Sequence, residues 1–227
     1  MLKAWFRALG QLFSPPLRRV VALSLAITLA SFIVLWVVVA FALGHLPTIG
    51  WRPLNWLVEL LGVVGVALLS WLLFPAVATM IMGLFIERIA AAVEALDYPG
   101  RGAPRRQSIR ETVMTGLRLM LLTIALNLLA LPIYVLLPGI NVFVFLGLNG
   151  YLFGREYFET VALRRLDATA VKQLRHRCAG RIFFAGVMVA GMFAVPVINL
   201  VAPVVATAFM LHVFEGLPRL APAGAAF

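Results

Sequence analysis

The sequence predicts an all-α integral membrane protein with two long spanning helices, two helical hairpins that partly penetrate the bilayer, and amphipathic surface helices. Of its 227 residues, 63% are hydrophobic and 12% are charged, so a soluble domain of this composition could not cover its core with polar groups. The hydrophobic residues fall in blocks that are long enough to cross or enter a bilayer. Two of these blocks are interrupted by the same motif, Pro-x-Ile-Asn.

This repeated motif predicts the tips of the two hairpins, at Pro138–Asn141 and at Pro196–Asn199. Proline lacks the N–H that a continuing helix needs, and asparagine favours turns and caps. Paired interruptions of apolar segments are also typical of transporters, in which they mark the substrate site. The candidate residues of a transport pathway are therefore Pro138, Gly139, Asn141, Pro196 and Asn199.

The distribution of charge predicts the orientation of the chain. The formal net charge is +10, and of the 19 Lys and Arg residues only Arg52 falls in the loop predicted to lie outside. Positive residues gather in cytoplasmic segments, so we expect a multi-pass protein of a bacterial inner membrane with both termini in the cytoplasm. The expected partners of this charge are membrane lipids and small anions, not nucleic acid. The single Cys178 excludes an internal disulfide and a metal site built from several cysteines.

Residues 1–19 form a basic cytoplasmic segment without acids. A short helix within it is predicted to lie on the membrane surface through one apolar face. The first spanning helix follows over residues 20–43, and it is too long for the apolar core of a cleavable signal peptide, so we expect it to remain as an anchor. The apolar face of the short surface helix consists of Trp5, Phe6, Leu9, Leu12 and Phe13.

The start of the first spanning helix carries a candidate anion site. Ser14 is a suitable N-cap, and prolines are accepted in the first turn because its N–H groups have no partner within the helix. The guanidinium groups of Arg18 and Arg19 add to the partial positive charge of the helix N-terminus, and together they can bind a small anion. The alternative is that both arginines are ordinary flanking charges that bind lipid phosphates.

The second long helix is predicted over residues 54–97, crossing the bilayer and continuing into the cytoplasm. Pro75 should kink it. Glu59 is placed near the outer head groups, with a role in transport as the alternative. The cytoplasmic end has a polar face made of Glu87, Arg88, Glu94 and Asp97.

Hairpin 1 is predicted over residues 109–159, and Ser108 and Glu111 form a capping-box pattern at its start. It is expected to penetrate the bilayer partly, although its longer first arm could span. Turns leave backbone groups unpaired in lipid, so both tips should be buried against other helices, a water-filled cavity or another subunit.

Hairpin 2 is predicted over residues 182–215, after a basic cytoplasmic segment at 160–181 in which Asp167 caps a short helix. Its arms of about 14 residues reach roughly 21 Å, short of the ~30 Å hydrocarbon core, so it should enter the membrane and turn back. Residues 216–227 form a cytoplasmic tail.

Asparagines and glycines in the hairpins have simple structural interpretations. Asn141, Asn149 and Asn199 are expected to cap the tips or to form interhelical hydrogen bonds, with ion coordination as the alternative. Three glycines share one helix face and allow close contact with another helix. These are Gly147, Gly150 and Gly154.

Arg155 and Glu159 are four residues apart, so we expect a surface ion pair between them. The sequence contains no Walker-type phosphate loop, no His and Glu residues at metal-binding spacing, and no convincing Ser/His/Asp arrangement. We therefore expect neither an enzyme nor a cofactor or metal site. Movement or binding of an anion is favoured over catalysis.

Taken in order, four segments resemble the CysZ sulfate permease family, which belongs to the wider etoposide-induced protein 2.4 superfamily. The resemblance implies an inner-membrane protein with two long helices and two partly penetrating hairpins. It also implies sulfate entry that supplies cysteine synthesis, and assembly into dimers or larger oligomers. The segments are Pro16–Arg19, Leu137–Asn141, Tyr151–Glu159 and Val195–Leu200.

The family binds sulfate through a Gly-Leu/Ile-Arg motif and a following arginine, which correspond here to Pro16, Leu17, Arg18 and Arg19. Proline stands where the family usually has glycine, and this removes one backbone N–H from the site. The literal triplet recurs at residues 116–118, where we interpret it as chance.

Two hypotheses follow. The first is an inner-membrane anion permease or channel, with sulfate as its substrate, in which the arginine pair gathers the anion and the hairpin tips line the path. The second is a non-transporting membrane scaffold that binds lipid or partner proteins through its basic inner face. Anion binding that depends on Arg18 and Arg19 and prefers sulfate to phosphate would distinguish the two.

Overall fold

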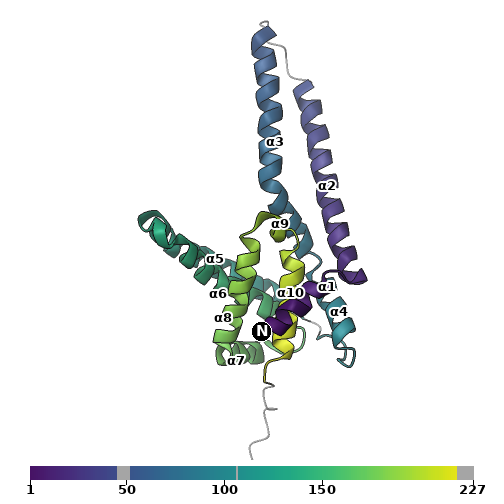
Figure 1. The fold of residues 1–227 in the computed structure, drawn as a ribbon, viewed down its shortest axis with the longest axis vertical. Coiled ribbons are helices and arrows are strands. Elements are labelled where there is room, and N and C mark those ends of the chain that lie inside the picture. Colours follow the sequence, from purple (N-terminus) through teal and green to yellow (C-terminus); the bar gives the residue numbers. More distant parts are fainter. Residues whose placement is uncertain (45–51, 106, 219–227) are drawn as a thin grey trace, which may run out of the picture.

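The computed structural model describes residues 1–44, 52–105 and 107–218, apart from some side chains within the helices. Over these residues the chain is entirely helical, with no strand, as the sequence predicted. Two long helices rise side by side from a body of shorter helices, and one hairpin projects from that body (Figure 1).

Helix α1 (Leu2–Gln11) packs against the last helix, α10 (Ala202–Glu215). Ala8 is buried, and the ring of Trp5 meets that of Phe209 edge-on with 5.0 Å between centroids. Phe6 and Phe13 are exposed. The predicted apolar face is therefore divided, because its tryptophan packs against protein while its phenylalanines remain free to meet a membrane.

Helices α2 (Pro15–Gly44) and α3 (Arg52–Gly83) form the long pair. Helix α2 begins at Pro15, so the proline pair lies in its first turn, as predicted, and the predicted spanning stretch 20–43 falls within it. Between the two helices the rings of Phe32 and Phe74 lie 5.4 Å apart, and Trp36 Nε1 donates a hydrogen bond to Ser70 Oγ at 3.1 Å.

The single helix predicted over residues 54–97 is wrong, because the chain turns at Leu84 and Phe85. Their N–H groups bond to the carbonyls of Ile81 and Met82 at 3.1 and 3.0 Å, and helix α4 (Ile86–Asp97) begins after this break. Helix α4 buries Ile89, Ala90 and Val93 in the core, where it contacts α10.

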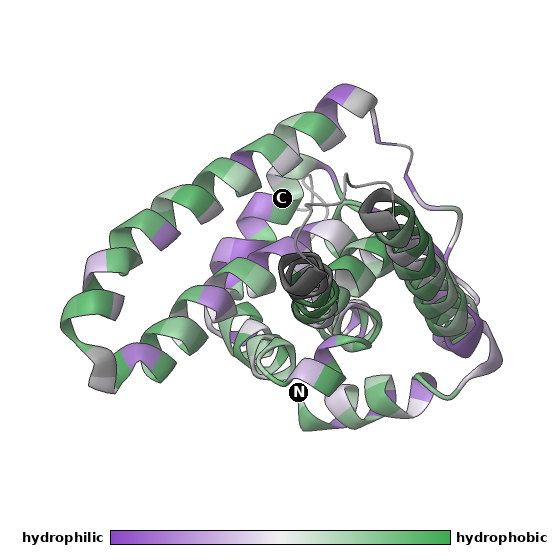
Figure 2. Cartoon of the chain, turned by 90° about the horizontal axis from the view of Figure 1, so that it is seen from above, coloured by the Kyte–Doolittle hydropathy of each residue, from purple (hydrophilic) through white to green (hydrophobic). Residues whose placement is uncertain are grey.

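Hairpin 1 consists of α5 (Ile109–Leu136), the short helix η1 (Pro138–Ile140) and α6 (Asn141–Ala162). The predicted cap is present, with Ser108 Oγ accepting a hydrogen bond from the Glu111 N–H at 3.2 Å. Helix α5 packs against α6 and η1, and hydrophobic residues that are largely exposed predominate along it (Figure 2).

By length and composition, two stretches of the described chain could cross a membrane, Pro15–Phe41 and Arg110–Leu136. The first lies in α2 and the second is the longer arm of hairpin 1, which was predicted to be able to span. The depth to which hairpin 1 enters the bilayer stays a prediction.

Helix α7 (Ala168–Arg177) has the predicted cap, in which Asp167 Oδ1 accepts from the Ala170 N–H at 2.7 Å. Hairpin 2 follows as α8 (Ala179–Phe193), the short α9 (Pro196–Asn199) and α10, beginning three residues before its predicted start. Both of its arms are short apolar helices, as expected. Helix α10 is the centre of the body, because it contacts α1, α3, α4, α6 and α8 and is buried from Ala202 to Val213.

Helices α6 and α8 touch through glycines. A Cβ on Gly150 would lie 2.5 Å from Val187 Cγ2, and one on Gly154 would lie 2.6 Å from the Ile182 carbonyl oxygen. This confirms the close contact predicted for both positions. Gly147 has nothing within 4 Å of such an atom, so it is not part of the contact, whereas Gly186 of α8, which we did not single out, is its closest point.

A buried arginine joins α4 to the end of α6. The Arg164 side chain is 3% exposed and forms ion pairs with Glu87 and with Glu94, the latter at 2.9 Å. Arg165 Nη2 approaches the same Glu94 oxygen at 2.9 Å. Burial alone would raise the pKa of Glu94, but hydrogen bonds and positive charge from the two arginines outweigh it and hold the pKa below its ordinary 4.5.

Acid should therefore weaken the fold through Glu94. A carboxylate with a depressed pKa contributes stability above its ordinary value of 4.5, and this contribution is lost as the pH falls through the lower pKa of the folded state. We expect the thermal midpoint of the detergent-solubilised protein to fall further between pH 7 and about pH 3 than that of a Glu94→Gln variant. Equal falls in both proteins would contradict this.

Several predictions lie outside the described residues. They are residues 45–51 of the outer loop predicted over residues 44–53, the side chains of Glu59, Pro75 and Pro138, and the tail beyond residue 218.

Candidate functional site

The predicted anion site lies at the start of α2, directly after the turn that follows α1. The Arg18 N–H bonds to the Ser14 carbonyl oxygen at 2.9 Å, which closes the first turn of α2. Ser14 Oγ is buried and has no hydrogen-bond partner among the described residues, so the predicted side-chain cap does not form. Pro15 and Pro16 explain this in part, because neither has an N–H to offer to the hydroxyl.

The four predicted sulfate-binding residues have different surroundings. Leu17 is completely buried in the core, and Pro16 is half-buried. Arg18 and Arg19 are exposed, and neither forms an ion pair within the part of the chain that the structure describes. Leu17 thus anchors the turn, while the two guanidinium groups remain available to an anion at the positive end of a long helix.

The tip of hairpin 2 packs against the long helices. Pro196 is exposed and Asn199 half-buried, and α9 contacts α3. Pro196, Val197 and Leu200 border an apolar groove of about 350 Å³ whose other walls come from α2 and α3. This tip is therefore supported by other helices, as predicted.

The tip of hairpin 1 lies far from that of hairpin 2 (Figure 1). Gly139 is exposed, and Asn141 caps the tip by donating from Nδ2 to the Tyr134 carbonyl oxygen at 3.2 Å. Its Oδ1 is buried with no described partner. Asn149 bonds within its own helix, to the Phe145 carbonyl oxygen at 2.9 Å, so the predicted interhelical bond is absent there. One chain alone does not bring the two tips together.

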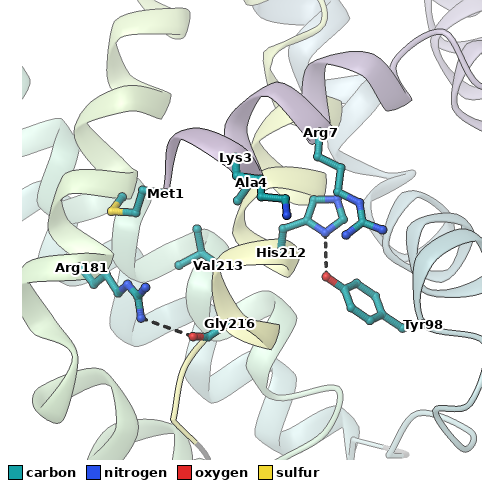
Figure 3. Close-up of a pocket in the computed structure, with 9 residues that line it drawn as sticks. All are labelled: Met1, Lys3, Ala4, Arg7, Tyr98, Arg181, His212, Val213 and Gly216. Atoms are coloured by element: carbon teal, nitrogen blue, oxygen red, sulfur yellow. Dashed lines mark hydrogen bonds between the residues drawn. The ribbon is translucent and has the colours of Figure 1, made fainter.

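Sequence reasoning missed a basic cavity of about 310 Å³ between α1, α8 and α10 (Figure 3). Lys3 and Arg7 reach it from α1 and Arg181 from α8. Arg7 Nε pairs with Asp97 Oδ2 at 2.9 Å, and Arg181 Nη1 donates to the Gly216 carbonyl oxygen at 3.3 Å. The i, i+4 spacing of the α1 cations was a visible signal, but nothing local indicates that Arg181 joins them.

Two residues that line this cavity, Tyr98 and His212, belong to a chain of hydrogen bonds. Tyr98 Oη lies 2.8 Å from His212 Nδ1, and His212 Nε2 lies 2.9 Å from Gln11 Oε1. The amide of Gln11 in turn donates to Asp97. Because Gln11 Oε1 can only accept, Nε2 of His212 carries the proton and Nδ1 accepts from the tyrosine. Burial raises the pKa of Tyr98, so its hydroxyl remains a donor.

The local electrostatics favour binding of an anion. Three cationic side chains line the cavity, and one carboxylate, Asp97, offsets part of their charge. No group of His, Cys, Asp or Glu among the described residues is arranged to hold a metal ion.

Comparison with known families decides the class of the protein. Residues 4–203 match the family described as Sulfate transporter CysZ/Etoposide-induced protein 2.4. The chain belongs to this family. The match covers the start of α2 and both Pro-x-Ile-Asn tips. A comparison with curated individual proteins gives no match.

Membership of the CysZ/etoposide-induced protein 2.4 family confirms the resemblance and makes the chain a membrane protein of a sulfate transporter type. The all-helical architecture with long apolar helices agrees with this class. The family is one of transporters, not of enzymes.

Proposed function

We propose that the protein is a sulfate permease or channel of a bacterial inner membrane, that both termini lie in the cytoplasm, and that the sulfate it admits feeds cysteine synthesis. The observation that carries this proposal is the pair Arg18 and Arg19, exposed and without described ion pairs at the start of a 30-residue apolar helix. Family membership supports the choice of sulfate among small anions.

In this proposal the arginine side chains supply the hydrogen-bond donors that the backbone lacks at the two prolines. Pro15 and Pro16 leave Leu17 as the first residue of α2 with an N–H. A guanidinium can donate two parallel hydrogen bonds to a tetrahedral oxyanion, so two of them are sufficient to hold sulfate. The basic cavity lined by Lys3 and Arg181 would raise the local concentration of the anion at the same end of the molecule.

The transport path is proposed to require more than one copy of the chain. The two tips are apart within one chain, and α5 carries a long exposed apolar face (Figures 1 and 2). A homo-oligomer would cover part of that face and could bring tips of different copies together around a path.

The driving force must come from outside the chain. Moving two negative charges inward against 100 mV, inside negative, costs about 4.6 kcal/mol. Import therefore needs a concentration gradient, rapid consumption of sulfate inside, or a coupled proton.

The decisive experiment is uptake of radiolabelled sulfate into liposomes that contain the purified protein. Replacing both Arg18 and Arg19 with alanine should lower the initial rate at least about tenfold, because charge-assisted hydrogen bonds to the anion are lost. A matched control removes two other exposed arginines, Arg110 and Arg177. It should leave the rate within about twofold of the parent protein.

Two other outcomes would change the assignment. Uptake that is unchanged by the Arg18→Ala/Arg19→Ala pair would retain transport but move the anion site elsewhere. No uptake above empty liposomes by folded protein would favour the scaffold, which should attract sulfate and phosphate equally weakly and lose both with added salt.

A further inference from the structure

A second cluster of cations lines a separate pocket of about 100 Å³ between α5, α6 and α7. Four positive side chains converge on it, Arg118 from α5, Arg155 from α6, and Lys172 and Arg175 from α7. One carboxylate, that of Glu159, lines the same pocket. The charge of this group is therefore +3, counted as four cations less one carboxylate.

Glu159 neutralises only part of this charge. Its Oε1 accepts from Arg155 Nε at 2.9 Å and lies 3.4 Å from Arg175 Nε, so two guanidinium groups share one oxygen. Both arginine side chains are largely buried, with 18% and 17% exposed. The ion pair predicted for the surface is thus mostly buried, and it belongs to a three-residue cluster.

The pocket also contains an unsatisfied donor. Arg175 Nε is buried and has no hydrogen-bond partner among the described residues. Arg118 and Lys172 are exposed and form no described ion pair. The Nε of Arg175 lies 3.4 Å from Glu159 Oε1 without forming a hydrogen bond, so this largely buried guanidinium is only partly compensated and a further ligand of opposite charge would stabilise it.

The position of Arg118 indicates where such a ligand would come from. It is the last charged residue of α5 before the apolar stretch that begins at Leu119, so it marks the boundary between the charged and apolar parts of the helix. A second pocket, of about 300 Å³, shares Arg155 and Arg175 and is mainly apolar, with Tyr151 among its lining residues. Positive groups beside an apolar surface, near the boundary between the charged and apolar parts of α5, suit either a free phosphate or the phosphate of a lipid.

We propose that the pocket formed by Arg118, Arg155, Lys172 and Arg175 binds a tetrahedral oxyanion, either a free inorganic anion or the phosphate of an anionic lipid head group. The site is distinct from the Arg18–Arg19 pair and does not depend on the protein being a sulfate permease. The bound oxyanion joins α5 and α7 to α6. It accepts hydrogen bonds from those N–H groups of the four cations that do not bond to Glu159.

The test compares two variants that lose the same charge. Arg118→Gln/Lys172→Gln removes the exposed cations of the pocket, which have no described ion-pair partner, so the fold should persist. Arg110→Gln/Arg177→Gln removes two exposed arginines from the same two helices, outside the pocket. Melting curves establish that both are folded.

Both variants are made in a chain in which Arg18 and Arg19 are alanine, so the result is independent of the site under Proposed function. Each purified protein is titrated calorimetrically with sodium sulfate and sodium phosphate at constant ionic strength, and then with short-chain phosphatidylglycerol, with phosphatidylcholine for comparison.

For a free anion, the dissociation constant for sulfate or phosphate should rise at least about tenfold in the pocket variant and less than about twofold in the matched variant. For a head group, the inorganic anions should not bind, and the same contrast should appear with phosphatidylglycerol alone. Equal losses in the two variants, or no binding of any probe by the parent chain, would overturn the proposal.

Discussion

Replacing Gly186 with alanine should be the most damaging single substitution in this protein. A Cβ at this position would lie 1.9 Å from the Gly150 carbonyl oxygen and 2.5 Å from the Gly154 backbone nitrogen. These are backbone atoms of α6, so no side chain can rotate away to make room. Helices α6 and α8 must separate instead, and we expect a loss of about 3 kcal/mol or more in stability, at the upper end of overpacking costs.

The matched control is Gly191→Ala in the same helix, where an added Cβ meets nothing within 4 Å. Alanine there should be neutral or stabilising by up to about 1 kcal/mol, because it favours the helix more than glycine does. Thermal unfolding in one detergent and size-exclusion profiles measure the difference. A Gly186→Ala protein as stable as the parent would mean that α6 and α8 do not touch as described.

The second large effect is expected at Arg164. Its 3% exposed guanidinium lies between Glu87 and Glu94, and Glu94 is itself only 12% exposed. Arg164→Met retains much of the aliphatic volume but leaves the Glu94 carboxylate with Arg165 as its remaining partner. Breaking a buried ion pair on one side costs about 3–5 kcal/mol when the remaining charge has no other partner. Because Arg165 still pairs with Glu94, we expect a smaller loss of about 2 kcal/mol and a looser junction between α4 and α6.

Arg177→Met is the control for Arg164→Met, because Arg177 is an exposed arginine with no described ion pair. It should change stability by less than about 0.5 kcal/mol. Thermal midpoints and limited proteolysis at the α3–α4 turn report on both variants. If they unfold alike, the buried pair does not hold α4 in place.

The features that were predicted correctly are local. Pro138 and Pro196 interrupt apolar runs, Ser108 and Asp167 are N-caps, and the glycine spacing of α6 permits close contact. Each depends on residues within a few positions of one another, for which backbone chemistry is enough.

The features that were missed depend on distant partners. The turn at Leu84 precedes a helix, α4, that packs against α10, more than a hundred residues later. No sequence pattern around Gly186 marks it as a helix contact, because its importance depends on the position of α6. Lys3 and Arg181 line the same cavity only because α1 packs onto α10, so the spacing of the α1 cations was visible in the sequence but the addition of Arg181 was not.

The projecting helix α5 ties the shape of the protein to the thickness of its bilayer. The uncharged part of α5, residues 119–136, is about 27 Å long at 1.5 Å per residue, close to a hydrocarbon layer of about 30 Å. Within the chain this arm has little lateral support beyond α6 and η1, so the hydrophobic mismatch that a thinner bilayer creates is relieved most easily by tilting the arm. A thinner membrane would press the arm toward the bilayer plane, and the lipid environment thereby sets the geometry of any assembly built on this face.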